Sequence, residues 1–599
     1  MCDLSNGAPQ RAHSPTCRLA SLAMVSAALA LPAAHAAAQL QVADVLPGPR
    51  SSAPTGFAAL DDTTVLFIAD DGSVGYELWR TDGTTAGTTR VKDIYPGSQG
   101  SRVSSGWAMA SQGRVFFEAS DGANGPELWV SDGTATGTVL VKDIAPGPQG
   151  SRPTGVALMN GLLYFVATEP TMGQELWVTD GTAAGTQLVK DIHPGTASSS
   201  PRDFAEVNGR LFFVADDGTH GGEVWVTDGT AAGTQLHLDV AMGPATSYAR
   251  ELTSFNGQLW FHATDGVIGH ELWTWGTGGV LEFTSFADIA PGSASSFPHR
   301  LTVAGGQLFF SANDGASGTE LWVTDGSTAN VRIVRDLNLG ATSSHPSRLT
   351  EFNGALCFAA EDGTGGGHQL WITDGSSAGT QKLHDVNLGR SPPLGIPDGL
   401  APMGGKLFFA GDDGVSGFEL WVTDGTAGGT RLVRDILPGR SGSVSTRSVG
   451  YAANDRLFFT ADDGVTGSEP WVIHAADLAD CRSRNVLGNP TGYTCSTPPV
   501  LGASWQSDVA MTSRTVSTIV GLAALPDPGT RFLGGHLLIG LGGPTAFMAN
   551  GTGAFSLPIP DQSVLLGAPM FTQAFRLELL AAGGTDLEML NAQDLTLGR

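Results

Sequence analysis

The sequence holds little cysteine, little charge and few basic residues, and each shortage narrows the class of protein. Cysteine accounts for five of 599 residues, and charged residues make up 15% of the chain. Lys and Arg together number 32 against 58 Asp and Glu, which gives a formal net charge of −26 at pH 7. Because this sign disfavours contact with phosphate backbones and anionic lipids, we expect no nucleic-acid partner.

Several motifs of catalysis and cofactor binding are also missing. The chain contains no His-Glu-x-x-His, no Cys-x-x-Cys pair, no phosphate-binding P-loop and no Gly-x-Gly-x-x-Gly. Catalytic residues are therefore not assigned from the sequence, and these motifs indicate no cofactor. A glycosidase is not excluded, because its two carboxylates come from distant parts of a chain.

Long apolar stretches are confined to the N-terminus. Arg11 and Arg18 precede an apolar run over 19–34, and Ala34-His35-Ala36 offers a cleavage site. This pattern predicts a signal peptide over 1–36 and a secreted or periplasmic protein, with attachment at the cell surface left open. The alternative is an N-terminal membrane anchor, for which the run is short. We expect a monomer without a membrane span after signal removal.

The cysteines that follow residue 36 have different surroundings. Cys481 and Cys495 stand 14 residues apart in a stretch rich in Gly, Pro and Asn, which predicts a disulfide in an oxidising compartment. Cys357 takes the place of a repeated Phe, and we expect it to be a buried thiol.

A phrase of the form Glu-Leu-Trp-x-x-Asp-Gly-Thr recurs through most of the chain. Its tryptophans are spaced 48 to 50 residues apart, and nine of them align: Trp79, Trp129, Trp177, Trp225, Trp273, Trp322, Trp371, Trp421 and Trp471. A period of this length with about four strand signals is typical of propeller blades.

One unit shows the expected blade. Residues 348–352 alternate as a short strand, Asn353-Gly354 suits a two-residue hairpin turn, and 355–360 form an apolar second strand. A third strand carries Trp371, and a fourth covers 381–386 before a longer loop. Three tight turns and one crossover make a four-stranded blade.

The two ends of the repeat region complement each other. Residues 42–48 match a fourth strand without its first three, and the ninth unit, 457–472, stops before an Asp-Gly-Thr. We therefore predict an all-β fold, a closed propeller of nine four-stranded blades over 40–473, in which the N-terminal strand completes the last blade.

Over about residues 40–473 the chain resembles the ELWxxDGT-repeat family of secreted bacterial proteins. The resemblance implies a propeller-like extracellular protein and no catalytic residues. Departures from the pattern are Trp275-Gly276-Thr277 in unit five, Gln369 in unit seven and Glu169-Pro170 in unit three.

Repeated residues favour structural roles. Nine tryptophans at one strand position indicate packing between blades. The alternative is a circle of tryptophans whose side chains stack on sugars. Asp424-Gly425-Thr426 suits a turn in which the carboxylate accepts backbone N–H groups, as in the Asp-box turns of sialidase propellers.

One acidic residue per unit is expected on a shared rim, in the loops between second and third strands. Six of these loops are candidate calcium sites, and they carry Asp71, Asp121, Asp217, Asp265, Asp413 and Asp463. Glu169, Asp314 and Asp362 stand at the same position in the other units. The favoured alternative is that each carboxylate caps its own turn.

Residues that break the repeat are better candidates for function. His220, His270 and His368 lie in the rim loops and suit a metal or acid–base role, although solvated loop histidines are commoner. Five arginines precede or open the first strands but fall out of register, which argues against an anion-binding ring: Arg152, Arg202, Arg250, Arg300 and Arg348.

The repeat ends after Val472. Residues 474–498 are predicted to be a disulfide-bearing linker, and 499–599 a small β-sandwich module of short apolar runs and turns. We expect an exported, non-enzymatic binding protein with a glycan or protein ligand. The alternatives are a carbohydrate-active hydrolase or lyase working in the channel, and a calcium-stabilised structural protein of the cell envelope.

Overall fold

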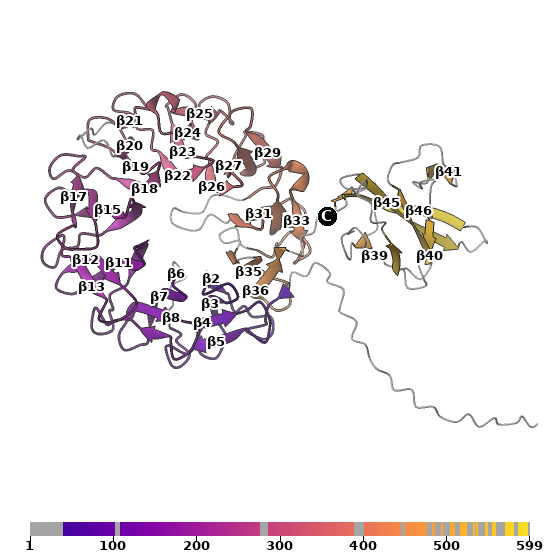
Figure 1. Ribbon diagram of the computed structural model, residues 1–599, viewed down its shortest axis with the longest axis horizontal. Helices are drawn as coiled ribbons and strands as arrows, with labels where there is room; N and C mark the ends of the chain where they lie inside the picture. Colours follow the sequence, from indigo (N-terminus) through magenta and orange to yellow (C-terminus); the bar gives the residue numbers. More distant parts are fainter. Residues whose placement is uncertain are drawn as a thin grey trace, which may run out of the picture. The chain divides into compact units, whose positions relative to one another are not determined.

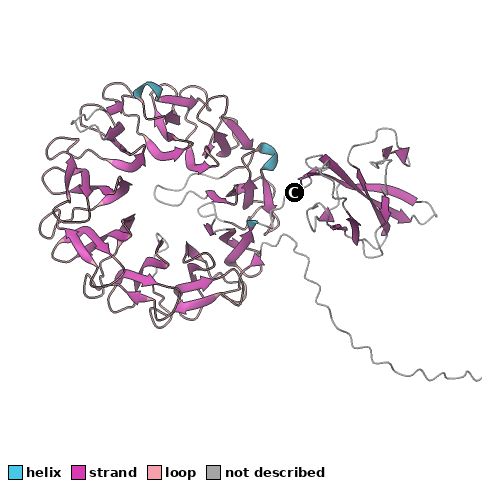
Figure 2. Ribbon diagram, viewed as in Figure 1, coloured by secondary structure: helices cyan, strands magenta, loops and turns pink. Residues whose placement is uncertain are grey.

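The computed structural model describes residues 40–475, apart from 102–107, 276–284, 389–399, 445–449 and 454, and the backbone of short strands from 482 onward. The chain divides into two compact units, Ala37–Ala479 and a second that contains Asp480–Arg599. The fold is all-β, with short 3-10 turns such as η1 (Thr328–Asn330) and η2 (Ala427–Gly429) (Figure 2). Among the described residues no helix has the length and apolar character needed to cross a membrane.

Nine four-stranded antiparallel sheets follow one another around a ring, as predicted (Figure 1). Blades 1 to 3 comprise β2 (Thr55–Ala59), β3 (Val65–Asp70), β4 (Tyr76–Thr81), β5 (Thr89–Lys92); β6 (Ala108–Ser111), β7 (Arg114–Ser120), β8 (Pro126–Ser131), β9 (Val139–Leu140); β10 (Thr154–Met159), β11 (Leu162–Glu169), β12 (Gly173–Thr179), β13 (Gln187–Lys190). Blades 4 to 6 comprise β14 (Arg202–Val207), β15 (Arg210–Asp216), β16 (Gly222–Thr227), β17 (Gln235–Leu238); β18 (Arg250–Phe255), β19 (Gln258–Ala263), β20 (Glu271–Trp275), β21 (Ser285–Ala287); β22 (His299–Ala304), β23 (Gln307–Asn313), β24 (Thr319–Thr324), β25 (Arg332–Arg335). Blades 7 to 9 comprise β26 (Ser347–Phe352), β27 (Ala355–Ala360), β28 (Gln369–Thr373), β29 (Gln381–His384); β30 (Leu400–Met403), β31 (Lys406–Asp412), β32 (Phe418–Thr423), β33 (Arg431–Arg434); β34 (Tyr451–Ala453), β35 (Arg456–Asp462), β36 (Ser468–His474) and β1 (Leu40–Gln41).

The N-terminal strand β1 is the fourth strand of blade 9. Leu40 pairs with Val472 and Gln41 with Trp471 in antiparallel register. The guanidinium of Arg456 in blade 9 donates to the carbonyl of Asp82 in blade 1 at 2.6 Å. These contacts join the last sheet to the first, so both ends of the repeat region lie in one blade.

Turns within a blade follow from the residues that the repeat supplies. Asn353 takes a left-handed φ of 52° and Gly354 a φ of 81°, which the predicted two-residue hairpin requires. Asp424 accepts the N–H of Thr426 at 2.9 Å and its hydroxyl at 2.6 Å, so its carboxylate organises the turn after β32. The first turn places Phe352 opposite Ala355, and the second leads into β33, where Arg431 lies opposite Val422.

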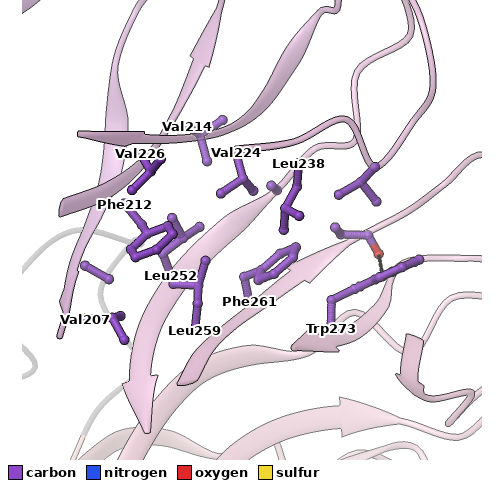
Figure 3. Close-up of a cluster of buried hydrophobic side chains, with 14 residues drawn as sticks. Val207, Phe212, Val214, Val224, Val226, Leu238, Leu252, Leu259, Phe261 and Trp273 are labelled. Carbon is purple, nitrogen blue, oxygen red and sulfur yellow. Dashed lines mark hydrogen bonds between the residues drawn. The ribbon is translucent and has the colours of Figure 1, made fainter. Parts of the chain in front are cut away.

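The core consists of apolar layers between neighbouring blades. In Figure 3, Phe212 and Val224 of blade 4 face Leu259, Phe261 and Trp273 of blade 5. The Trp273 side chain is 5% exposed and its indole N–H donates to the carbonyl of Ala263 at 2.8 Å. The repeated tryptophans therefore occupy interblade positions, most of them buried, and those at 79 and 322 half-buried.

The second unit is also built of strands. A five-stranded sheet has the order β37 (Arg482–Arg484), β46 (Thr585–Thr596), β45 (Pro569–Leu579), β40 (Thr515–Ala523), β43 (Ala546–Met548). A three-stranded sheet contains β38 (Tyr493–Thr494), β39 (Ser504–Val509) and β44 (Ala554–Pro558), and β41 (Arg531–Phe532) pairs with β42 (Gly535–His536). The sandwich arrangement stays a prediction. The signal peptide over 1–36 and the predicted disulfide between Cys481 and Cys495 lie outside the described residues.

Candidate functional site

The crossover loops between blades are held by the glutamate of the repeated phrase. Glu223 of β16 is fully buried, and its carboxylate accepts the backbone N–H of Val240 at 2.9 Å and that of Ser247 at 2.8 Å. Burial raises the pKa of Glu223 to about 7. Because the same carboxylate accepts hydrogen bonds from both ends of the crossover, it restrains the conformation of the loop.

The residue after the serine bound by this glutamate differs between units, and it is exposed in four described crossovers and half-buried at Ala53 and Ser200. It adopts a left-handed φ of 46° to 52° in the six described crossovers of this type: Ala53, Arg152, Ser200, Tyr248, Phe297 and His345. Such a φ is uncommon for residues other than glycine and costs free energy when the side chain is bulky. This position varies from alanine to tyrosine on a constant scaffold, which is the pattern expected of a ligand-contacting position.

Two of these variable residues are exposed aromatics that flank one histidine. Tyr248 is 55% exposed and Phe297 is 50% exposed. The His270 ring, in the turn before β20, lies 5.6 Å from the Tyr248 ring and stacks on Phe297 with centroids 5.1 Å apart and an interplanar angle of 20°. We call Tyr248, His270 and Phe297 the aromatic platform. It brings together the two crossovers on either side of blade 5.

A buried histidine orients the centre of the platform. His262 of β19 is 3% exposed; its Nε2 lies 2.8 Å from His270 Nδ1, and its Nδ1 lies 3.0 Å from the carbonyl oxygen of Pro298. Burial lowers the pKa of His262 to about 4, so the ring is neutral at pH 7. Because a carbonyl only accepts, His262 Nδ1–H donates to Pro298 and its Nε2 accepts from His270. His270 Nε2 is then left as an acceptor for a ligand hydroxyl.

Carboxylates next to the platform are engaged by their neighbours. Glu251 contacts His299 through Oε1 at 3.2 Å and accepts the N–H of Leu301 at 3.1 Å. Burial alone would raise the pKa of Glu251, but these bonds outweigh it and lower the pKa. Asp203 accepts the N–H of Glu251 at 3.1 Å, and burial raises its pKa. A chain of contacts thus joins the inner strands of blades 4, 5 and 6.

The inner strands position this cluster around the ring centre. β18, β22 and β26 lie nearer the middle of the ring than β17, β25 and β29 (Figure 1). Asp203 and Glu251, like Arg300 and Arg348, stand at a left-handed bulge of the innermost strand, with φ between 54° and 61°. Glycine takes this place at Gly155, where no side chain is presented. Blades 4 to 7 therefore carry charged residues at this position, whereas the described blades 1 and 3 carry Gly56 and Gly155.

Of the histidines predicted from the sequence, only His270 belongs to the platform. His220 pairs with Asp217 at 2.8 Å in blade 4, and His368 lies 3.3 Å from Glu361 in blade 7. The arginines occupy different register positions: Arg202 and Arg250 open their strands, whereas Arg300 and Arg348 follow one residue later. Tyr248 and Phe297 were not among the residues predicted from the sequence. The signal in the sequence that could have identified them is a position that varies between units, directly after a serine that recurs.

The rim acidic residues are bound within their own loops. Asp121 Oδ1 accepts the N–H groups of Ala123 and Asn124, both at 2.9 Å, and Asp413 accepts those of Val415 and Ser416 in the same way. In the described residues, no group of three or more His, Cys, Asp or Glu is suited to hold a metal ion. Calcium at these loops stays a prediction.

A pocket of about 320 Å³ lies where blade 9 meets blade 1. Its lining includes Leu60, Asp61, Asp62 and Tyr451. The Asp61 carboxylate accepts the N–H groups of Thr63 and Thr64 in its own turn, at 2.7 and 2.8 Å. This carboxylate therefore has a structural role in its own turn.

Comparison with known proteins gives a likeness of fold only. No family model matches the chain, and no curated protein matches it. Similar solved structures include a puromycin-hydrolysing peptidase of Mycobacterium tuberculosis, with 13% identity, a TM-score of 0.35 and coverage of 62% of this chain and 61% of that one. Prolyl oligopeptidase B from Galerina marginata has 10% identity, a TM-score of 0.32 and coverage of 63% and 56%. A sialidase of Trypanosoma rangeli has 10% identity, a TM-score of 0.22 and coverage of 74% and 84%. The chain spans less than two thirds of the length of either peptidase, and at these scores no activity or residue role is transferred to it.

Proposed function

We propose that the protein is an exported, non-enzymatic glycan-binding protein whose ligand lies on the aromatic platform of blade 5. Export is supported by the N-terminal charge and apolar pattern of residues 1–36. The observation that carries the binding role is the placement of two exposed aromatic rings, Tyr248 and Phe297, on either side of His270.

The chemistry of the platform suits a sugar chain. The C–H face of a pyranose packs on aromatic rings, and ring hydroxyls need directed donors and acceptors beside that face. Tyr248 supplies a ring with a phenol, Phe297 supplies a purely apolar ring, and His270 Nε2 supplies an acceptor. The contacts of both rings with His270 restrain them before the ligand arrives, which lowers the entropy cost of binding.

The proposal is tested by incubating the full chain with insoluble cellulose, chitin, xylan and starch, and with laminarin and polygalacturonate coupled to beads. Retained protein and released reducing ends are scored together. We expect retention on at least one polysaccharide without release of reducing ends. Retention on none of them would overturn a glycan ligand and leave a protein partner as the remaining binding role.

Matched variants assign retention to the platform. Tyr248→Ala and Phe297→Ala remove the rings at exposed positions, and we expect each to weaken retention by about tenfold or more, as loss of a central aromatic contact does. Arg152→Ala changes the same left-handed, exposed crossover position in blade 3 and serves as the control. Equal weakening in all three variants would place the ligand elsewhere.

A carbohydrate-active enzyme is the second candidate, and the pair of Asp203 and Glu251 favours it. Their surroundings move their pKa values in opposite directions, up for Asp203 and down for Glu251, as in an acid–base pair. Both carboxylates are nevertheless occupied by hydrogen bonds within the fold. Release of reducing ends that disappears in both Asp203→Asn and Glu251→Gln would replace the binding role with this one.

A further inference from the structure

Arg250 is an exposed cation beside the aromatic platform. It stands two residues after Tyr248, at the start of β18, and its side chain is open to solvent. Its charge reaches His270, because Arg250 contributes, after burial, to the lowering of the His270 pKa. Arg250 is also the partner of His262 in the sheet register, and His262 Nε2 lies 2.8 Å from His270 Nδ1, so the backbone places Arg250 next to the platform.

The neighbouring carboxylates form no ion pair with this cation, although the charge of Arg250 acts on the Asp203 carboxyl and favours its ionised form. Glu251 contacts His299 and the N–H of Leu301, and Asp203 accepts the N–H of Glu251. The Arg202 guanidinium, by contrast, lies 3.9 Å from the Asp203 carboxylate and donates to the carbonyl of Ser200. Across the part of the chain that the structure describes, no carboxylate lies within ion-pair distance of Arg250. In a chain with a net charge of −26, Arg250 is thus an exposed cation that is available to a ligand anion.

We propose that the platform binds an anionic polysaccharide, with the Arg250 guanidinium pairing with a carboxylate or sulfate group of the sugar while the rings pack on its apolar face. A planar guanidinium donates two parallel hydrogen bonds to either anion. The global negative charge does not oppose this, because at physiological salt charges farther away than about 8 Å are largely screened. This inference names the ligand class of the proposed function and rests on it.

Matched polysaccharide pairs separate charge from ring contacts. Native gels are cast with polygalacturonate or its methyl ester, and with dextran sulfate or dextran, and the retardation of the full chain is measured at several concentrations. The first pair presents or masks a carboxylate, and the second presents or omits a sulfate. We expect the anionic member of at least one pair to bind about tenfold more tightly, and added salt to reduce that preference.

Arg250→Gln tests the residue itself. It keeps a polar side chain at an exposed position, and we expect it to abolish the preference for the anionic member while binding to the neutral member is unchanged. Arg152→Gln, in blade 3, is the matched control and should keep the preference. A preference that persists in Arg250→Gln would overturn the inference.

The failure of this inference is distinguishable from the failure of the proposed function. Equal retardation by the anionic and neutral members would overturn the role of Arg250 and leave glycan binding in place. Retardation by none of the four polymers, together with no retention on the insoluble panel, would overturn both.

Discussion

The crossover loops into blades 4 and 5 have the same backbone conformation and the same glutamate–serine hydrogen bond, but they differ in the residue after the serine. Glu175 accepts the N–H of Ser199 at 2.9 Å, and Glu223 accepts that of Ser247 at 2.8 Å. The next residue has a φ of 50° at Ser200 and 52° at Tyr248. Ser200 is half-buried, whereas the Tyr248 ring is more than half exposed. Because the backbone is the same, the difference in side chain reports what each crossover does rather than how it folds.

The two crossovers show two different free-energy costs in the molecule. Burying the glutamate costs free energy, but its carboxylate accepts hydrogen bonds from backbone groups that the crossover would otherwise leave unpaired. A bulky aromatic in the left-handed region also costs free energy, and at Tyr248 and Phe297 the ring contacts His270 but stays about half exposed. A residue that strains the backbone and then projects into solvent is best explained by what it contacts outside the chain.

The largest expected effect comes from breaking the shared scaffold. Trp225 is 5% exposed and packs among Leu211, Phe213 and Ala215, with Lys190 Nζ 5.6 Å from its ring centre. Trp225→Ala should lower the free energy of unfolding by about 3 to 5 kcal/mol, because it leaves a large cavity between blades. Chemical denaturation followed by intrinsic fluorescence measures the change.

Tyr248→Ala is the matched control for that prediction. It also truncates an aromatic ring, but one that is exposed, so its free energy of unfolding should stay within about 0.5 kcal/mol of the wild type. An unchanged denaturation curve for Trp225→Ala would refute the packing role of the repeated tryptophans.

The next effect depends on pH and concerns the buried glutamates. The pKa of Glu223 rises from 4.5 when unfolded to about 7 when folded. The folded state therefore binds the proton more tightly, and this stabilisation is complete below pH 4.5 and is lost as the pH rises through 7. In Glu223→Gln the group no longer titrates. The stability of the wild type relative to this variant should fall by about 1 to 3 kcal/mol between pH 4.5 and 8.

Urea denaturation of both proteins at several pH values gives this difference. The histidines His237 and His262, whose pKa values burial lowers to about 4, act in the opposite direction below pH 6.5, but they are common to both proteins and cancel. Blade 7 carries Gln369 at the equivalent position, which shows that glutamine fits the strand. A constant difference across this pH range would mean that the buried carboxylate stays ionised.

The sequence predicts the scaffold because the scaffold repeats. Nine copies of one phrase show which residues pack and which turn. A lone fourth strand at one end and an unfinished blade at the other predict that the N-terminal strand completes blade 9, and in the structure Leu40 pairs with Val472. The platform could not be found this way. Tyr248, His270 and Phe297 belong to three loops, and their ring contacts depend on the residues at positions that the repeated phrase does not fix. His262 was hidden for another reason, since its strand position already varies between units, from Val214 to Glu118.

A smaller effect on stability is expected when one hydrogen bond that restrains a crossover is removed. The Ser296 hydroxyl donates to the Glu271 carboxylate at 2.6 Å. Ser296→Ala should cost about 1 to 2 kcal/mol of stability and also weaken polysaccharide retention, because Phe297 is then free to leave its left-handed conformation. Ser199→Ala removes the equivalent hydroxyl in blade 4 and should cost similar stability with no change in retention. Loss of retention in both variants would show a global rather than a local effect.

The smallest expected effect distinguishes the backbone of Tyr248 from its ring. Glycine adopts a φ of 52° freely, whereas alanine at the same φ retains the clash between its Cβ and the backbone. Both Tyr248→Gly and Tyr248→Ala lose the ring, so both should lose retention to the same extent. The glycine variant should nevertheless be more stable than the alanine variant by about 0.5 to 1 kcal/mol, after the larger entropy of an unfolded glycine is subtracted. Thermal denaturation of the two variants measures this difference, and an alanine variant as stable as the glycine one would mean that the crossover relaxes in solution. A confirmed difference would show that this position gives up stability to hold an aromatic ring on the surface, which is the expected cost of a binding residue rather than of a packing residue.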